Sequence, residues 1–159
     1  MRAFVLLVSA LAVQAAQGAV TVTYGNPDRF TDAGDRSNDP VKIAQALADH
    51  LRRLGESLPQ GTDVRIEILD VDRAGRPRLN LPTETRIMNG KSDPPCIELR
   101  YEVVTRGSAS AAQRERVCDT DYLRRLPAHY SEHDPLVYEK RMLDEWFRAR
   151  FGDVPRSPR

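Results

Sequence analysis

The chain has 159 residues, with 24 Lys or Arg and 23 Asp or Glu, so its formal net charge at pH 7 is +1. This length suits one globular domain. Because the two signs of charge are interspersed and no basic stripe occurs, nucleic acid is not an expected partner, and the charges indicate a solvated surface.

The N-terminus has the pattern of an export signal. A positive start at Arg2 is followed by an apolar run over residues 3–13 and by small residues from Ala15 to Ala19. This is typical of a secretory signal peptide, here residues 1–19, with cleavage between Ala15 and Ala19. The alternative, a membrane anchor, needs about 20 apolar residues, and this run is shorter. No later run is apolar enough to span a bilayer, so we expect a periplasmic or secreted protein without a transmembrane segment after cleavage.

The first half of the mature chain predicts three strands and a helix. Residues 20–24 are rich in β-branched side chains and predict the first strand. The Asn-Asp-Pro sequence at residues 38–40 favours a helix start, since Asn or Asp caps free amides and proline suits the first turn. This helix should end at Gly55. Residues 64–68 alternate apolar and charged side chains, which predicts a half-buried second strand, and residues 85–88 predict a short third one. The apolar face of the helix comprises Val41, Ala44, Leu47, Ala48, Leu51 and Leu54.

The two cysteines, Cys96 and Cys118, lie at equal distances from Gly107, which begins a run of small residues. Strand-like segments on both sides of that run predict a β-hairpin, and an even number of cysteines in an exported protein predicts a disulfide across it. In this register Glu98 faces Arg116 beside the disulfide, on the polar face of the sheet. The bond would close a loop of roughly 20 residues, contribute about 3 kcal/mol and hold the register. A metal site or a reactive thiol is the alternative use of the two cysteines.

A final helix is predicted to begin at Asp134 and Pro135 and to end at Gly152. Its core-facing stripe comprises Leu136, Lys140, Leu143, Phe147 and Phe151, widened by Met142 and Trp146. Residues 153–159 should form a disordered tail. The order strand, helix, strand, short strand, hairpin, helix predicts a single α+β domain over residues 20–152. We expect a mostly antiparallel sheet with two amphipathic helices packed on one face.

Two aspartates, Asp70 and Asp72, are the strongest candidates for chemistry. They lie two residues apart at the end of the second predicted strand, so their side chains should point to one side. Paired carboxylates bind hard cations or share acid–base work. The structural interpretation is stronger, because aspartates after a strand commonly accept backbone amides or pair with arginine. The nearby arginines are Arg73, Arg76, Arg78 and Arg86.

A second, weaker candidate is the histidine pair His129 and His133. On a helix this spacing of four would place both rings on one face, as zinc requires. Pro127 and Pro135 argue against a long helix here, and no third ligand is evident. The sequence also contains no nucleophile elbow and no phosphate-binding glycine loop. We therefore expect neither a metal nor a cofactor.

Nine segments lie in order along most of the chain after the signal: residues 20–24, 26–27, 30–32, 58–61, 68–75, 85–88, 95–101, 118–119 and 121–123. Together they resemble a family of exported bacterial proteins, domain-of-unknown-function family 3016. The strongest is the Asp-x-Asp-x-Ala-Gly run of residues 70–75, in which Arg73 stands where family members usually carry an apolar residue. The two cysteines are an elaboration, so the family does not imply the disulfide. The resemblance implies an envelope or secreted location but no activity and no catalytic residue.

We therefore expect a non-catalytic module that binds an envelope protein, a peptide or a small ligand. The motivation is export together with a charged surface and no nucleophile–base set. One alternative is a metal-assisted hydrolase that uses Asp70 and Asp72, with His129 and His133 as further ligands. The other is a purely structural envelope protein. The predicted fold does not distinguish these three functions, because one fold hosts many functions.

Overall fold

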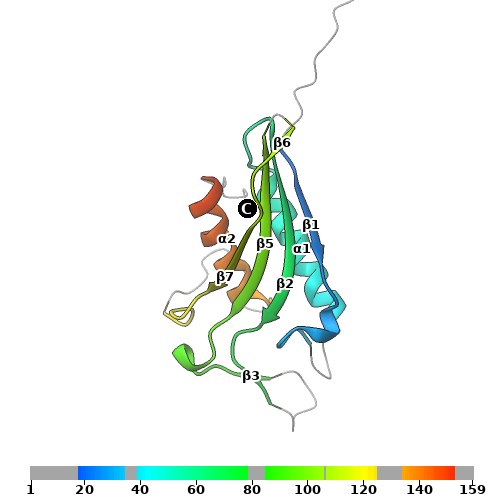
Figure 1. The fold of residues 1–159 in the computed structure, drawn as a ribbon. Helices are drawn as coiled ribbons and strands as arrows, with labels where there is room; N and C mark the ends of the chain where they lie inside the picture. The colour runs from blue at the N-terminus through cyan, green and yellow to red at the C-terminus, as the bar shows by residue number, and fades with distance from the viewer. Residues whose placement is uncertain (1–17, 35–38, 79–84, 106, 125–133, 153–159) are drawn as a thin grey trace, which may run out of the picture.

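The computed structural model describes residues 18–34, 39–78, 85–105, 107–124 and 134–152 (Figure 1). The predicted signal peptide, apart from its last two residues, and the predicted tail lie outside these ranges and stay predictions. Among the described residues, no helix is long and apolar enough to cross a membrane. The elements are β1 (Val20–Tyr24), η1 (Pro27–Arg29), α1 (Pro40–Gly55), β2 (Thr62–Asp72), β3 (Arg76–Pro77), β4 (Arg86–Ile87), η2 (Gly90–Ser92), β5 (Cys96–Thr105), β6 (Ser108–Ala109), β7 (Gln113–Cys118) and α2 (Val137–Phe151).

The main sheet has the strand order β1-β2-β5-β6, and β7 also pairs with β5. The pair β1–β2 is parallel and is joined through α1, whereas β2, β5, β6 and β7 pair antiparallel. Strands β3 and β4 form a separate two-stranded ribbon. Both helices pack on the same face of the main sheet (Figure 1). The predicted α+β architecture, with a mostly antiparallel sheet, is therefore confirmed.

The core lies between this sheet and the two helices. Along β2, alternate residues point inward, so that Val64, Ile66 and Ile68 are each at most 2% exposed. Apolar residues of β1, β5 and both helices complete the same cluster. The predicted apolar face of α1 is buried except at Val41, which is 44% exposed. The opposite face of the sheet carries charged side chains.

A β-bulge interrupts β2 just before its two aspartates. The register with β5 shifts between Ile68 and Asp70, so Asp70 faces Glu98 and Asp72 faces Cys96. Without the extra residue, strict alternation would place Asp70 on the same inner face as Ile68. The bulge instead turns both aspartates to the outer face and returns Val71 to the core, where it is fully buried.

The predicted hairpin and its disulfide are confirmed. Cys96 and Cys118 are bonded, with Cα atoms 4.2 Å apart, and Glu98 is the register partner of Arg116. The ion pairs run diagonally, however. Glu98 of β5 accepts from Nε of Arg114 on β7 at 2.7 Å. Arg116 of β7 reaches across β5, and its Nη2 lies 3.5 Å from a carboxylate oxygen of Asp72 on β2. The polar face is thus a cross-strand network that links β2, β5 and β7.

Helix α2 begins at Val137, two residues after the predicted proline. The Asp134 side chain accepts from the Leu136 amide at 2.9 Å and from Lys140 Nζ at 2.6 Å, so it orders the turn before the helix. Gly152 ends the helix with a φ of 96°, a left-handed conformation that suits glycine. Two charged residues on α2, Glu139 and Arg141, are buried, which the apolar stripe did not predict.

Candidate functional site

Asp70 fastens the loop after η1 to the bulged strand. Its two carboxylate oxygens accept from Thr31, one from the backbone amide at 2.6 Å and one from the hydroxyl at 2.7 Å. Both oxygens are therefore committed to one residue of a neighbouring loop. This is the backbone-amide role that the structural interpretation of the sequence describes.

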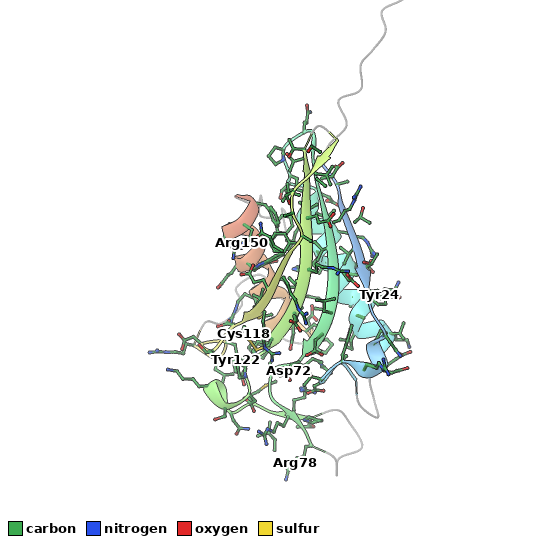
Figure 2. The ribbon with its side chains drawn as sticks, viewed as in Figure 1. Tyr24, Asp72, Arg78, Cys118, Tyr122 and Arg150 are labelled. Atoms are coloured by element: carbon green, nitrogen blue, oxygen red, sulfur yellow. A yellow bond between two sulfur atoms is a disulfide. The ribbon has the colours of Figure 1, made fainter. Side chains whose placement is uncertain are left out.

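Asp72 lies in a group of charges at the same edge. Asp32 forms an isolated parallel bridge with it, and Arg116 lies 3.5 Å away. Burial raises the pKa of the Asp72 carboxyl above its usual 3.8, and the charges of Asp32 and Asp70 add to this shift while Arg116 opposes it. Figure 2 shows Asp72 at the end of the sheet where Cys118 and Tyr122 also lie.

Arg86, on β4, ties down the turn that follows these aspartates. Its side chain is 6% exposed and forms an ion pair with Asp32. Its Nε donates to the Ala74 carbonyl at 2.8 Å, and Nη2 donates to the Gly75 carbonyl at 2.7 Å. One guanidinium thus bridges the loop before α1 and the Ala-Gly turn, and its five donors in a rigid fork suit this role.

Glu139 holds the other side of that turn from α2. It is 1% exposed, and its Oε1 accepts from the Ala74 amide at 2.8 Å. Its Oε2 is buried and has no hydrogen-bond partner among the described residues. Burial raises the pKa of this carboxyl, and the Ala74 amide and the charges of Arg73 and Arg86 partly oppose that effect. Arg73 itself is 1% exposed and donates to the Pro135 carbonyl at 3.3 Å.

These contacts show that the Asp-x-Asp-x-Ala-Gly run, residues 70–75, is a structural junction. The segment is held by Thr31 through Asp70, by Arg86 and by Glu139, so it joins the sheet to the loop before α1 and to α2. One signal for Glu139 was present in the sequence: it lies three and four residues before Met142 and Leu143, on the apolar side of the helix.

Of the four candidate metal ligands, only Asp70 and Asp72 lie among the described residues. His129 and His133 lie outside the described residues. Within the part of the chain that is described, no group of three or more His, Cys, Asp or Glu side chains is arranged to hold a metal ion. The described histidine His50 is buried and pairs with Asp144 at 2.7 Å, which joins α1 to α2.

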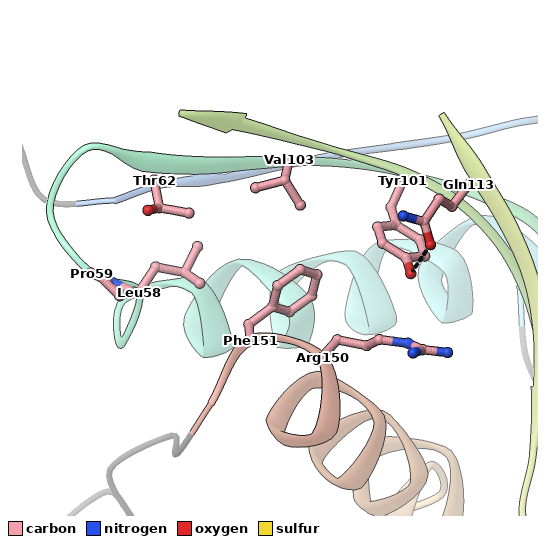
Figure 3. A pocket seen from close by; sticks show the side chains of 8 residues that line it. All are labelled: Leu58, Pro59, Thr62, Tyr101, Val103, Gln113, Arg150 and Phe151. Carbon is pink, nitrogen blue, oxygen red and sulfur yellow. Dashed lines mark hydrogen bonds between the residues drawn. The ribbon is translucent and has the colours of Figure 1, made fainter. Parts of the chain in front are cut away.

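A pocket of about 370 Å³ lies at the other end of the sheet (Figure 3). It opens between the inner face of the β2–β5 region, the turn after α1 and the last turn of α2. Leu58, Val103 and Phe151 form apolar walls, and the Tyr101 ring stands edge-on to that of Phe151 with centroids 6.0 Å apart. The complete lining is Leu58, Pro59, Thr62, Tyr101, Val103, Gln113, Arg150 and Phe151.

Three polar side chains at this pocket, those of Tyr101, Gln113 and Arg150, are already paired. The Tyr101 hydroxyl donates to Gln113 Oε1 at 2.8 Å (Figure 3). Arg150 donates to both oxygens of Glu115, at 2.7 and 3.2 Å, and Trp146 Nε1 donates to one of them at 3.1 Å. The hydrogen bond from Arg150 is the main cause that holds the pKa of Glu115 below its usual 4.5. The pocket therefore offers apolar walls and a rim without net charge.

Sequence reasoning did not find this pocket. Its lining residues come from four separate segments of the chain, and no one of these segments marks a pocket by its own sequence pattern. The sequence pattern places the aromatic residues near the end of α2 in the core, and Trp146, at 6% exposure, lies there. Phe151, one turn further on, is only partly buried.

The protein is a small α+β domain whose β5–β7 hairpin is closed by the Cys96–Cys118 disulfide. A disulfide is consistent with an extracytoplasmic location. Residues 18–149 match the family described as "Protein of unknown function (DUF3016)", and the chain belongs to this family. The resemblance noted from the sequence is thus confirmed over most of the chain. Searches of curated proteins and of solved structures found no significant match.

Proposed function

We propose that this protein is a non-catalytic, extracytoplasmic binding module whose recognition site is the pocket between β5 and the end of α2. The observation that carries the proposal is the composition of that pocket, with apolar walls and a few positioned polar groups. Its volume of about 370 Å³ lies within the range common for ligand sites. At the opposite end of the sheet, both oxygens of the Asp70 carboxylate accept hydrogen bonds from Thr31 and hold a loop in place.

The pocket chemistry favours a neutral, apolar group as the ligand. Leu58, Val103 and Phe151 supply the contact surface, while the Arg150–Glu115 ion pair adds no net charge. The Tyr101–Gln113 hydrogen bond offers one polar position beside these walls. An apolar or aromatic side chain of a peptide, or a small ligand of similar shape, fits this arrangement.

The test uses a matched pair of substitutions on adjacent residues of β5. Val103 lines the pocket, whereas Val104 points to the outer face, so Val103→Phe fills the pocket and Val104→Phe adds the same bulk elsewhere. The probe is the neutral apolar dye N-phenyl-1-naphthylamine, which carries no charge that could pair with the exposed cations elsewhere on the protein. Trp146, the only tryptophan, packs on Tyr101 and Phe151 and reports occupancy through its fluorescence.

We expect Val103→Phe to weaken dye binding at least about tenfold, because the added ring occupies the apolar volume. Val104→Phe should bind the dye as the parent protein does. Equal dye affinity in the parent and in Val103→Phe, with both variants folded by circular dichroism, would contradict the proposal.

A further inference from the structure

The end of the molecule that carries β3, β4 and η2 has an unusual charge distribution. We call this surface the loop end and define it as residues 73–78, 85–95 and 119–124. Among these residues, every exposed charged side chain is basic: Arg76, Arg78, Lys91 and Arg124. Figure 2 shows Arg78 at the tip of this end.

These cations are distant in sequence, and the fold brings their segments together. The Tyr122 hydroxyl donates to Asp93 at 3.0 Å and accepts from the Gly90 amide at 3.3 Å, so the segment after β7 rests on η2. The Gly75 amide donates to the Asp93 carbonyl at 3.0 Å, which brings in the segment that carries β3. The loop end is therefore one surface built from three segments.

The loop end contains three acidic residues, Asp93, Asp119 and Asp121, against six basic ones, and each of the three is buried or half-buried. Asp93 is held by Asn89 and Tyr122, and Asp119 is buried against Arg141 at 2.6 Å. None of the four exposed cations forms an ion pair with another described residue. On the outer face of the sheet the pattern differs, since each cation there has a carboxylate partner: Arg65 with Glu102, Arg100 with Glu67, Arg114 with Glu98 and Arg116 with Asp72.

Exposed apolar side chains lie among these cations. Of the three large hydrophobic residues that are exposed in the described part of the chain, two are on the loop end: Ile87, at 46%, and Leu123, at 44%. Leu123 lies beside Gly90 of η2, and Ile87 lies beside Gly75. Cations mixed with exposed apolar side chains are the composition of surfaces that rest at the membrane interface.

We propose that the loop end docks on an anionic lipid bilayer, with Arg76, Arg78, Lys91 and Arg124 facing the headgroups and with Ile87 and Leu123 entering the interface. Charge complementarity identifies this partner, because basic side chains near an anionic membrane each add to binding. The two apolar side chains favour a bilayer over a soluble polyanion, which offers no apolar layer. The surface is separate from the pocket, so this inference does not depend on the proposed ligand.

The test is cosedimentation of the processed protein with vesicles of phosphatidylcholine alone or with 30% phosphatidylglycerol. We expect binding only to the anionic vesicles and a strong loss of binding in 0.5 M NaCl, where charge interactions are screened. Arg78→Gln/Lys91→Gln should lower the partition coefficient roughly 25-fold, at about fivefold for each charge. Leu123→Ser should weaken binding about fivefold through lost apolar contact.

The matched control is Arg53→Gln/Arg65→Gln, which removes the same net charge from exposed positions outside the loop end. It should bind the anionic vesicles as the parent does. Three outcomes would overturn the proposal: no binding to anionic vesicles at low salt, an equal loss in the control double variant, or binding to heparin as tight as to vesicles and unaffected by Leu123→Ser. Circular dichroism establishes that each variant is folded.

Discussion

Single charged residues hold the end of β2 and the turn after it in place. Asp70 and Asp72 reach the outer face through the bulge, and Asp70 then accepts two hydrogen bonds from Thr31. Glu139, from a helix far along the chain, completes the same junction by accepting from the Ala74 amide. A buried carboxylate is costly unless it is paired, so the neighbouring charges of Arg73 and Arg86 are part of the same arrangement.

The raised pKa of Glu139 predicts a specific pH dependence. A carboxyl whose pKa rises on folding binds its proton more tightly in the folded state, so it favours folding below the usual 4.5 and loses this contribution as the pH rises toward the folded pKa. Glu139→Gln keeps an oxygen for the Ala74 amide and does not titrate. We therefore expect the stability of Glu139→Gln, relative to the parent, to increase from pH 4 to pH 7 in urea unfolding.

Two further variants make this prediction specific. Glu139→Ala leaves the buried Ala74 amide without its acceptor and should cost about 1–3 kcal/mol near pH 4. This cost should fall as the pH rises, because alanine does not titrate either. Glu56→Gln makes the same chemical change at an exposed position and should give no such trend. A stability difference between Glu139→Gln and the parent that stays constant across this pH range would show that Glu139 does not titrate differently in the folded state.

At the scale of elements, the sequence predicted the helices and the hairpin, because these depend on residues that are close together in the chain. Periodicity identified α1 and α2, and the position of Gly107 between the two cysteines predicted the register of β5 and β7. The parallel pairing of β1 with β2 and the bulge before Asp70 were not predicted, because each depends on contacts between distant segments. The pocket and the loop end were missed for the same reason, since no single segment contains either of them.

The hairpin disulfide leads to a prediction about stability. Cys96 and Cys118 are 22 residues apart, and in the chain-entropy model a closed loop of this size contributes about 3 kcal/mol. We expect Cys96→Ser/Cys118→Ser to lower Tm by roughly 10 °C in a domain of this size. The β5–β7 backbone ladder remains in this variant, so the far-UV circular dichroism spectrum should be unchanged.

The control for this prediction is the parent protein under reducing conditions. Dithiothreitol should lower its Tm to that of the double variant and should not affect the double variant itself. A reduced parent protein with two titratable thiols and an unchanged Tm would show that the bond adds no stability.

At the scale of the whole molecule, the two ends of the sheet have different surfaces. Strand β5 runs from Cys96, beside the loop end, to Thr105, beyond the pocket residue Val103. Ten residues of strand span roughly 30 Å, so the proposed pocket ligand and the proposed bilayer contact are at opposite ends. A protein resting on a membrane through its loop end would therefore hold the pocket away from the bilayer, open to a partner in the surrounding compartment.

Both proposals require export, and the N-terminal contacts predict where processing occurs. Gly18 is buried against the turn before β2, where a Cβ atom would lie 2.3 Å from the Thr62 carbonyl. The Ala19 amide donates to Asp63 at 3.0 Å, and its carbonyl accepts from the Val64 amide at 2.9 Å. Cleavage after Ala19 would remove these contacts from the folded domain. We therefore expect cleavage before Gly18, within the small-residue region that signal peptidases recognise.

The intact mass of the protein recovered from an extracytoplasmic fraction measures this cleavage site directly. A mature chain that begins at Ala16, Gln17 or Gly18 keeps both the Gly18 packing and the Ala19 hydrogen bonds, and it is the expected result. A mature chain that begins at Val20 would show that these contacts are dispensable, and an uncleaved chain confined to the cytoplasm would contradict export itself.

Because Gly18 has no room for a side chain, Gly18→Leu should destabilise the processed protein by about 1–3 kcal/mol in urea unfolding, by overpacking. The same substitution at Gly25, where a Cβ atom would meet nothing within 4 Å, is the matched control and should have little effect.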